Sequence, residues 1–245
     1  MAKQKKASKR PILAILLILM IMVAFYSFLH SSLFVIEKVY TVGAQAVSGQ
    51  EIIKFSGIKK GINIFDIDSE ASEKAITIIP RIKTADVVRH LPSQIEIRVT
   101  ERKPWALILA KDKYFIIDKE GVCLQKLQMF ELADLPIITL ARIPARINEG
   151  QQLGSKDIVL LNKVISAMPP ELAGTVSEYH CTADGQVYIY TLNGIEVRLG
   201  GADRLAEKIQ VFDEAMKLDK KSTKQKLSYI DLRYEGQPVV RYKHR

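Results

Sequence analysis

The longest apolar run in the sequence lies near the N-terminus. Residues 11–29 read PILAILLILMIMVAFYSFL and contain no charged side chain. An α-helix over residues 12–29 would rise about 27 Å, which is close to the hydrocarbon thickness of a bilayer. About a dozen residues in the run are Ile, Leu, Val or Phe, and each favours insertion by roughly 0.3–0.6 kcal/mol. The pattern therefore predicts a transmembrane helix over residues 12–30.

The residues before this run are strongly basic. Five lysines and arginines precede Pro11, and no acidic residue occurs before Glu37. Basic flanks of a span stay in the cytoplasm, so we expect residues 1–11 to be a cytoplasmic tail and the bulk of the chain to lie outside. The alternative is a cleaved signal peptide, but its apolar core would be unusually long and no A-x-A site follows. We expect an uncleaved single-pass anchor in the plasma membrane.

Residues 34–102 alternate between strand and helix patterns. Ser48 and Glu51 are spaced as a capping box at the start of one helix, and Asp68 or Ser69 is placed to cap a second helix. Pro80 ends that second helix. In the second of the two strands that follow, Ile95, Ile97 and Val99 point to one side, as in a half-buried strand. The order predicted is strand, helix, helix, strand, strand, which is a small α+β module.

Residues 103–245 are predicted to form a mostly antiparallel β module with flanking helices. The stretch QVYIYTLNGIEVRLG contains Asn193-Gly194, the preferred pair for a two-residue type I′ hairpin turn. That turn would place Leu192 opposite Ile195 and Tyr190 opposite Val197, so that one face is apolar throughout. A one-residue slip would turn this apolar set toward water. Amphipathic helices are expected over residues 155–168 and after Asp203.

The C-terminal eighteen residues, SYIDLRYEGQPVVRYKHR, predict an open sheet edge. Ile230, Leu232 and Tyr234 would share one face of a strand that breaks at Glu235-Gly236. A second β-leaning piece, Val239-Val240, follows, but we expect no further strand to cover the first one. An uncovered strand carries unpaired backbone groups that can pair with another chain.

Charge and cysteine content add little to this picture. The chain of 245 residues has a net charge of +9, but much of it lies in the tail, and 31 basic and 27 acidic residues remain beyond residue 30. No basic stripe interleaved with aromatic residues appears there, so nucleic acid is not an expected partner.

Cys123 and Cys181 do not make a disulfide framework, and we interpret them as small apolar side chains in strands. A single bridge outside the cytoplasm stays open.

A search for catalytic or metal-binding residues finds no convincing set. The four histidines lack an H-E-x-x-H spacing, and neither a phosphate loop nor a G-x-S-x-G motif is present. His180, Cys181 and Asp184 come closest to a metal site, but no second Cys/His pair lies nearby in the sequence. We expect no catalytic residues, no cofactor and no metal.

The lysine-rich residues 217–226 are interpreted as a solvated loop, with contact to anionic polymer or lipid headgroups as the alternative.

One long run resembles a known family. FSGIKKGINIFDID, followed by IPRIKTADVVRHLPSQIEIRVTERKPWALI, is similar to the POTRA module of the FtsQ/DivIB cell-division proteins. The downstream stretches FIIDKEGVCLQ, LPIITL and SYIDLRYEG also fit that family. The positions that carry the POTRA motif are Pro80, Arg89, Pro92, Glu101 and Pro104.

The resemblance implies a non-enzymatic bitopic scaffold of the bacterial divisome, enriched at the division septum. Such a protein docks FtsB/DivIC-like and FtsL-like proteins outside the membrane and helps control the septal peptidoglycan synthase. The alternatives are a POTRA-type chaperone for exported proteins and a membrane-anchored exported enzyme; no small-molecule substrate is expected.

The resemblance also implies that the last strand docks the FtsB/DivIC-like partner, and β-augmentation is the mode we expect. Tyr234 would be the aromatic anchor, although core packing is an equal alternative for it. Arg198 and Arg233 would face an acidic partner. Pro238 conflicts with a continuous ladder because it has no N–H to donate. The expected pairing rim consists of Glu235, Gly236, Gln237, Val239 and Val240.

Overall fold

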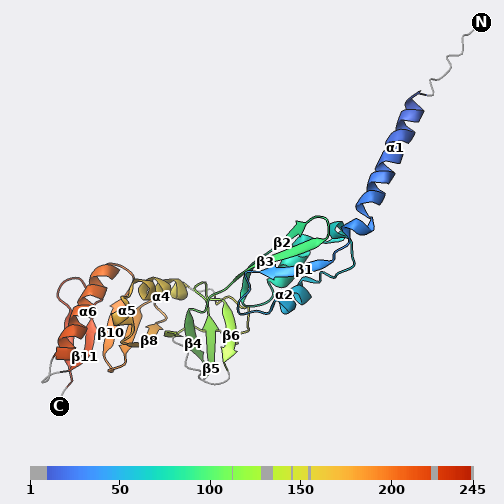
Figure 1. Cartoon of the computed structure of the whole chain (residues 1–245). Helices are drawn as coiled ribbons and strands as arrows, with labels where there is room; N and C mark the ends of the chain where they lie inside the picture. The colour runs from blue at the N-terminus through green and yellow to red at the C-terminus, as the bar shows by residue number, and fades with distance from the viewer. Residues whose placement is uncertain are drawn as a thin grey trace, which may run out of the picture. The chain divides into compact units, whose positions relative to one another are not determined.

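The computed structural model describes most of the chain and divides it into two compact units, 1–101 and 102–245. Figure 1 shows the elements of both units in order along the chain. The predicted cytoplasmic tail, except for its last two residues, and part of the predicted lysine-rich loop lie outside the described residues. The described residues are 10–111, 113–127, 135–144, 146–153, 156–221 and 226–243.

The apolar run near the N-terminus forms the helix α1 (Arg10–Leu29). Its segment Ile12–Leu29 has a mean hydropathy of 2.9, and none of it is buried against the rest of the protein. Over the described residues it is the one helix whose length and composition would allow it to cross a membrane.

The rest of the first unit follows the predicted order β-α-α-β-β. β3 lies between the other two strands of the sheet that residues 10–101 form, parallel to β1 and antiparallel to β2. The elements are η1 (Ser32–Phe34), β1 (Lys38–Val42), α2 (Gly49–Ser56), η2 (Ile64–Asp66), α3 (Ser69–Ile76), β2 (Ile82–His90) and β3 (Gln94–Glu101).

Local capping explains where the two helices of this unit begin. The Ser48 hydroxyl accepts a hydrogen bond from the Glu51 amide at 3.2 Å. The Asp68 carboxylate accepts one from the Ala71 amide at 3.0 Å, which makes Asp68 rather than Ser69 the second cap. Both bonds satisfy amides that lack a partner in the first helical turn. The helices bury their apolar faces against β1–β3 in an isoleucine-rich core that includes Ile36, Ile52, Ile64, Ile76, Ile95 and Ile97.

Glu101 binds a turn of backbone in the first unit. Its carboxylate accepts hydrogen bonds from the amides of Gln45, Ala46 and Val47 at 2.9, 3.0 and 2.9 Å. Burial alone would raise the pKa of Glu101, but these amides stabilise the ionised form and hold that pKa below its ordinary value of 4.5. The side chain therefore ties the segment before α2 to the end of β3.

Arg89 has a similar structural role at the other end of the sheet. Its Nε donates to the Ile64 carbonyl at 3.0 Å, and its Nη2 donates to the Ile67 carbonyl at 2.6 Å. The prolines of the motif lie at breaks: Pro80 follows α3, Pro92 lies in the turn between β2 and β3, and Pro104 precedes the first strand of the second unit.

The second unit is one mixed sheet with helices on one face. The strand order over its described residues is β12-β11-β10-β9-β8-β7-β4-β5-β6, with parallel pairing at β10–β11, β7–β8 and β4–β7 and antiparallel pairing elsewhere. The elements are β4 (Ala106–Ala110), β5 (Lys113–Ile117), β6 (Cys123–Leu127), β7 (Ile137–Leu140), α4 (Lys156–Ala167), α5 (Pro170–Ala173), β8 (Val176–Cys181), β9 (Val187–Thr191), β10 (Glu196–Gly200), α6 (Leu205–Lys221), β11 (Leu227–Asp231) and β12 (Val239–Tyr242).

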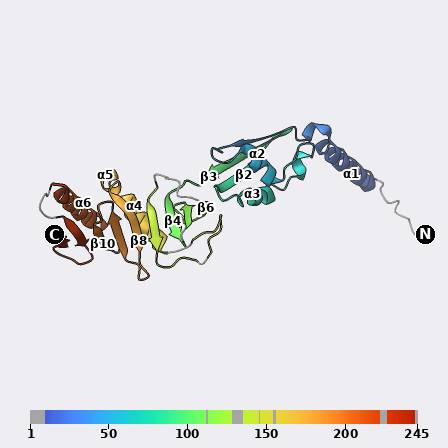
Figure 2. The same ribbon diagram turned by 90° about the horizontal axis from the view of Figure 1, so that it is seen from below.

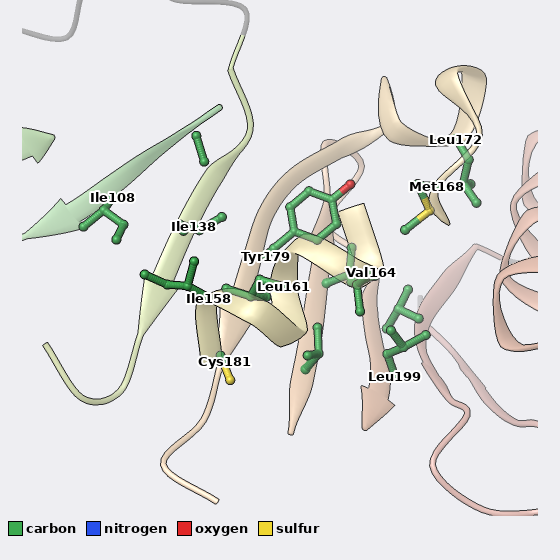
Figure 3. Close-up of a cluster of buried hydrophobic side chains, with 14 of the residues drawn as sticks. Ile108, Ile138, Ile158, Leu161, Val164, Met168, Leu172, Tyr179, Cys181 and Leu199 are labelled. Carbon is green, nitrogen blue, oxygen red and sulfur yellow. The ribbon is translucent and has the colours of Figure 1, made fainter. Parts of the chain in front are cut away.

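α4 and α6 cover the same face of this sheet, as Figures 1 and 2 show. In Figure 3, Leu161 and Val164 of α4 point into a cluster with Tyr179 of β8. α6 extends to Lys221, so the first five residues of the predicted lysine-rich loop are helical instead.

Cys123 and Cys181 both lie in this core as free thiols. Burial raises the pKa of each thiol to about 11. The interpretation as small apolar residues is confirmed, and the alternative of a single bridge is wrong.

The predicted register of the β9–β10 hairpin is wrong by one residue. Tyr190 pairs with Glu196 and Ile189 with Val197, so Ile189 and Thr191 are buried while Leu192 is exposed. The reason is the turn: Leu192, Asn193 and Gly194 form the loop, with Gly194 at φ +73°. A three-residue loop with a left-handed last residue competes with the two-residue type I′ turn, and the extra residue inverts the faces of one strand.

The Glu101 contacts predict a local effect of Glu101→Gln. The neutral amide can accept fewer and weaker bonds from the three backbone amides, and we expect a loss of about 1–3 kcal/mol because hydrogen bonds to charged groups are the strong ones. Hydrogen exchange of the full chain in detergent should show faster exchange at residues 45–47.

Glu70→Gln is the matched control, since Glu70 forms an exposed i,i+4 pair with Lys74 and such pairs contribute little. Unchanged exchange at residues 45–47 in Glu101→Gln would contradict the capping role.

Candidate protein-binding interface

β11 is covered on both sides by strands of the same chain. It pairs in parallel with β10 and antiparallel with β12, with Ile230 opposite Val197 on one side and Val240 on the other. The expectation that no strand covers Ile230 is therefore wrong. The chain reverses over residues 232–238, where Gly236 adopts φ +100°, a conformation that glycine tolerates. This reversal brings β12 back along β11 and moves the open edge one strand outward.

β12 is an edge strand. In the described part of the chain no strand pairs with its outer side, and all four of its residues are exposed. Pro238 precedes β12, so the conflict over its missing N–H does not arise within the ladder. The outer backbone N–H and C=O groups of an edge strand remain available to another strand.

An apolar groove runs beside this edge. Val240 and Tyr242 of β12 line it together with Val211, Ala215 and Leu218 of α6, and its volume is about 440 Å³. Leu218 lies on the exposed side of α6. The groove was not predicted from sequence. The amphipathic pattern of α6 indicates its core face, whereas the groove uses residues beside that face and a strand whose pairing the local pattern does not indicate.

Tyr234 lies in the turn between β11 and β12, and 70% of its surface is exposed. The alternative of core packing is therefore wrong. Because β11 ends at Asp231, the alternation that would bury Tyr234 does not continue, although Leu232 is still buried. The Arg233 guanidinium carbon lies 5.4 Å from the centroid of the Tyr234 ring, within reach of a cation–π contact.

Arg198 and Arg233 are both held by Asp231. Arg233 Nε and Nη2 donate to the two carboxylate oxygens at 2.9 and 2.6 Å. Arg198 Nη1 lies 3.8 Å from Asp231 Oδ2, and Arg198 Nε donates to Glu196 Oε1 at 2.7 Å. The Arg233 hydrogen bonds hold the pKa of the Asp231 carboxyl below its ordinary value of 3.8, despite burial. Both cations thus have partners inside the fold, and their contact with another chain stays a prediction.

The remaining residues of the expected rim divide between turn and strand. Glu235, Gly236 and Gln237 are exposed turn residues, and Val239 and Val240 are exposed residues of β12. The structure thus brings the expected rim to one end of the sheet. We define the C-terminal edge as β12 together with residues 232–238.

The residues considered for a metal site have other partners. His180 Nδ1 lies 2.7 Å from Thr139 Oγ1, and Asp184 accepts a hydrogen bond from Thr182. Over the described residues no group of three or more His, Cys, Asp or Glu side chains is arranged to hold a metal ion.

Two family models match the chain. The model described as "Cell division protein FtsQ/DivIB, C-terminal" matches residues 106–233, and "POTRA domain, FtsQ-type" matches residues 34–102. The C-terminal match includes β10, β11 and the start of the turn, and it ends before Tyr234 and β12.

Relatives with assigned names agree. A "Cell division protein FtsQ" of Myxococcus fulvus is 28% identical over 181 residues, which cover 71% of this chain and 62% of that protein. A "Cell division protein DivIB" of Clostridium botulinum is 26% identical over 244 residues, covering 97% of this chain and 92% of the relative.

Among solved structures, the extracytoplasmic domain of DivIB from Geobacillus stearothermophilus is 19% identical with a TM-score of 0.31, covering 51% of this chain and 99% of that domain. That likeness is too low to support an argument. The C-terminal family model alone spans more than half of the sequence, so this chain belongs to the FtsQ/DivIB family of cell division proteins.

Proposed function

We propose that this chain is a non-enzymatic, membrane-anchored scaffold of the divisome. It docks FtsB/DivIC-like and FtsL-like proteins outside the membrane and thereby helps control septal peptidoglycan synthesis. Family membership supports the role in cell division. The observation that carries the docking step is the open edge of β12 with an apolar groove beside it.

The proposed topology follows from the N-terminal segment. α1 crosses the plasma membrane once, with the basic tail in the cytoplasm and both units outside at the septum. The length and hydropathy of Ile12–Leu29 support the span, and the basic residues before it support the orientation.

The C-terminal edge suits β-augmentation by an extended segment of the partner. Backbone groups on the outer side of β12 would supply affinity, because an added strand forms a new ladder there. The side chains of an extended segment alternate between the two faces of the sheet. Every second side chain of the partner would therefore lie on the same face as Val240 and Tyr242, next to α6. An apolar residue at such a position can bury its side chain in the groove.

Tyr234 is the proposed anchor beside this strand. A large aromatic ring that is mostly exposed in the free chain gains apolar burial when a partner covers it. Its neighbour Arg233 is held by Asp231, so the turn that carries the ring is ordered before binding. An ordered turn lowers the entropy lost on association.

The Asp231 contacts predict that Asp231→Asn destabilises the second unit. The substitution leaves Arg233 without a charged acceptor, and we expect a loss of about 1–3 kcal/mol at pH 7. Because the folded pKa of Asp231 is depressed, its contribution is present above about pH 4 and is lost as the pH falls through the folded pKa. Thermal unfolding of the full chain in detergent should show a wild-type advantage that shrinks below pH 4.

Asp213→Asn is the control for that series, since Asp213 makes a solvent-facing i,i+4 pair with Lys217 on α6. An unfolding midpoint for Asp231→Asn that matches the wild type at pH 7 would show that Asp231 does not order the C-terminal edge.

β-augmentation predicts a distinctive pattern of hydrogen exchange. When the extracytoplasmic part of the FtsB/DivIC-like protein is added to the full chain, we expect alternate amides over Val239–Tyr242 to exchange more slowly. The period of two arises because only every second N–H of β12 faces outward. Amides of β6, the opposite edge of the sheet over the described residues, serve as the internal control. Binding that leaves the β12 amides unprotected would place the contact elsewhere.

The anchor role predicts that Tyr234→Ala weakens partner binding without unfolding the chain. We expect a loss of about 2 kcal/mol, or roughly 30-fold in Kd, for a buried aromatic hot spot. The unfolding midpoint should stay nearly unchanged because the side chain is exposed in the free chain. Calorimetric titration and thermal unfolding measure the two quantities.

Val159→Ala removes an exposed apolar side chain from α4, away from the C-terminal edge, and is the matched control. An affinity of Tyr234→Ala equal to that of Val159→Ala would remove Tyr234 from the proposed interface.

A further inference from the structure

The end of α1 is bound to the first unit by specific contacts. The Asn63 side-chain amide donates to the Leu29 carbonyl at 2.7 Å. The Phe34 ring lies 5.4 Å from the Phe28 ring and 5.2 Å from the Phe65 ring, measured between centroids. An aromatic path therefore connects the last turn of the apolar helix with the segment before α3.

Residues 59–65, here called the juxtamembrane loop, are held next to this helix end. The Ile36 amide donates to the Ile62 carbonyl, and the Gly61 amide donates to the Ile36 carbonyl, both at 2.9 Å. These backbone bonds fix the loop, so its side chains occupy defined places relative to Leu29.

Three large apolar side chains at this place are exposed. Leu33, which precedes Phe34, is 52% exposed, and Ile62 and Phe65 of the loop are 40% and 39% exposed. Exposed apolar groups on two segments next to the end of α1 indicate a surface that another apolar phase covers.

The juxtamembrane loop lies next to the end of α1, and this position identifies the covering phase as the membrane interface. Leu29 ends the segment that could cross the membrane, and the Phe65 ring lies within about 11 Å of Phe28 along the aromatic path. The headgroup region adds roughly 5–8 Å on each side of the hydrocarbon core. A loop hydrogen-bonded next to Leu29 therefore lies at the depth of the interface, where aromatic side chains are favoured.

The charges around the loop favour anionic lipid. Lys59 and Lys60 are exposed and form no ion pair within the described residues. Of the nearby acids, Asp66 lies 3.5 Å from the His30 ring nitrogen, and Glu37 is exposed. Two lysines beside inserted apolar groups can reach lipid phosphates while their stems lie along the apolar surface.

We propose that the juxtamembrane loop, together with Leu33, is a membrane-contact site that inserts Ile62 and Phe65 into the interface and binds anionic phospholipid headgroups through Lys59 and Lys60. The site attaches the first unit to the membrane surface and limits the directions in which it can extend from α1. This inference rests on the proposed transmembrane topology.

Spin labels on the full chain in lipid vesicles test the site. Three single substitutions carry the label: Phe65→Cys in the loop, Ile78→Cys as the matched control, and Val23→Cys in the middle of α1. Ile78 is 69% exposed and lies near the start of β2, at the end of the sheet opposite the start of β1. The native thiols are buried, so they compete little for the labelling reagent.

Collision with oxygen and with a water-soluble nickel complex reports the depth of each label. We expect the Val23 and Phe65 labels to favour oxygen and the Ile78 label to favour nickel. In vesicles that contain phosphatidylglycerol, the Phe65 label should lie deeper than in pure phosphatidylcholine. The double substitution Lys59→Gln and Lys60→Gln should abolish that difference.

The outcomes separate the site from the topology. A Phe65 label as exposed to nickel as the Ile78 label, with the Val23 label in lipid, would overturn the membrane contact and leave the anchor intact. A Val23 label in water would overturn the topology itself. Equal depth of the Phe65 label in the two kinds of vesicle would overturn the binding of anionic headgroups.

Discussion

The proposed docking depends on the backbone hydrogen bonding at one edge of the sheet in the second unit. Over the described residues, each interior strand of the second unit is paired on both sides, whereas β12 is paired only with β11. The outer N–H and C=O groups of β12 require water or another chain. Three of the four exposed residues of this strand are apolar or aromatic, with Arg241 as the one charge and a register shift in its ladder with β11, and apolar side chains on an edge favour pairing. The edge is therefore suited to a partner strand.

The parallel pairing of β10 with β11 explains why a groove accompanies this edge. Two consecutive parallel strands require a crossover, and here α6 supplies it. A crossover helix packs on the face of the sheet it connects, which places α6 beside β12 as well as over the core. The same helix therefore contributes Phe212 and Met216 to the core and Val211 and Leu218 to the groove. The crossover between β10 and β11 therefore accounts both for the buried helical layer and for the groove beside β12.

The charged side chains beside the C-terminal edge bind one another within the fold. Arg198, Arg233 and Asp231 form a compact cluster, so the edge offers a partner an ordered surface with its charges largely compensated. Affinity at such an edge would come from backbone pairing and apolar burial, and charge would mainly favour the correct partner. In the first unit, by contrast, Lys59 and Lys60 lack ion pairs among the described residues, and an anionic lipid surface is the partner they suit.

The sequence by itself determined the features that depend on near neighbours. The apolar run of α1, the Ser48 and Asp68 caps and the β-α-α-β-β order follow from local periodicity and capping, and the structure contains them. The position of Tyr234, the strand that covers β11 and the register of the β9–β10 hairpin were decided by the tertiary structure. Alternation along a chain shows that two faces differ, but pairing and turn length decide which face is buried and where a strand ends. Those depend on contacts between residues distant in sequence, such as Val197, Ile230 and Val240 lying side by side.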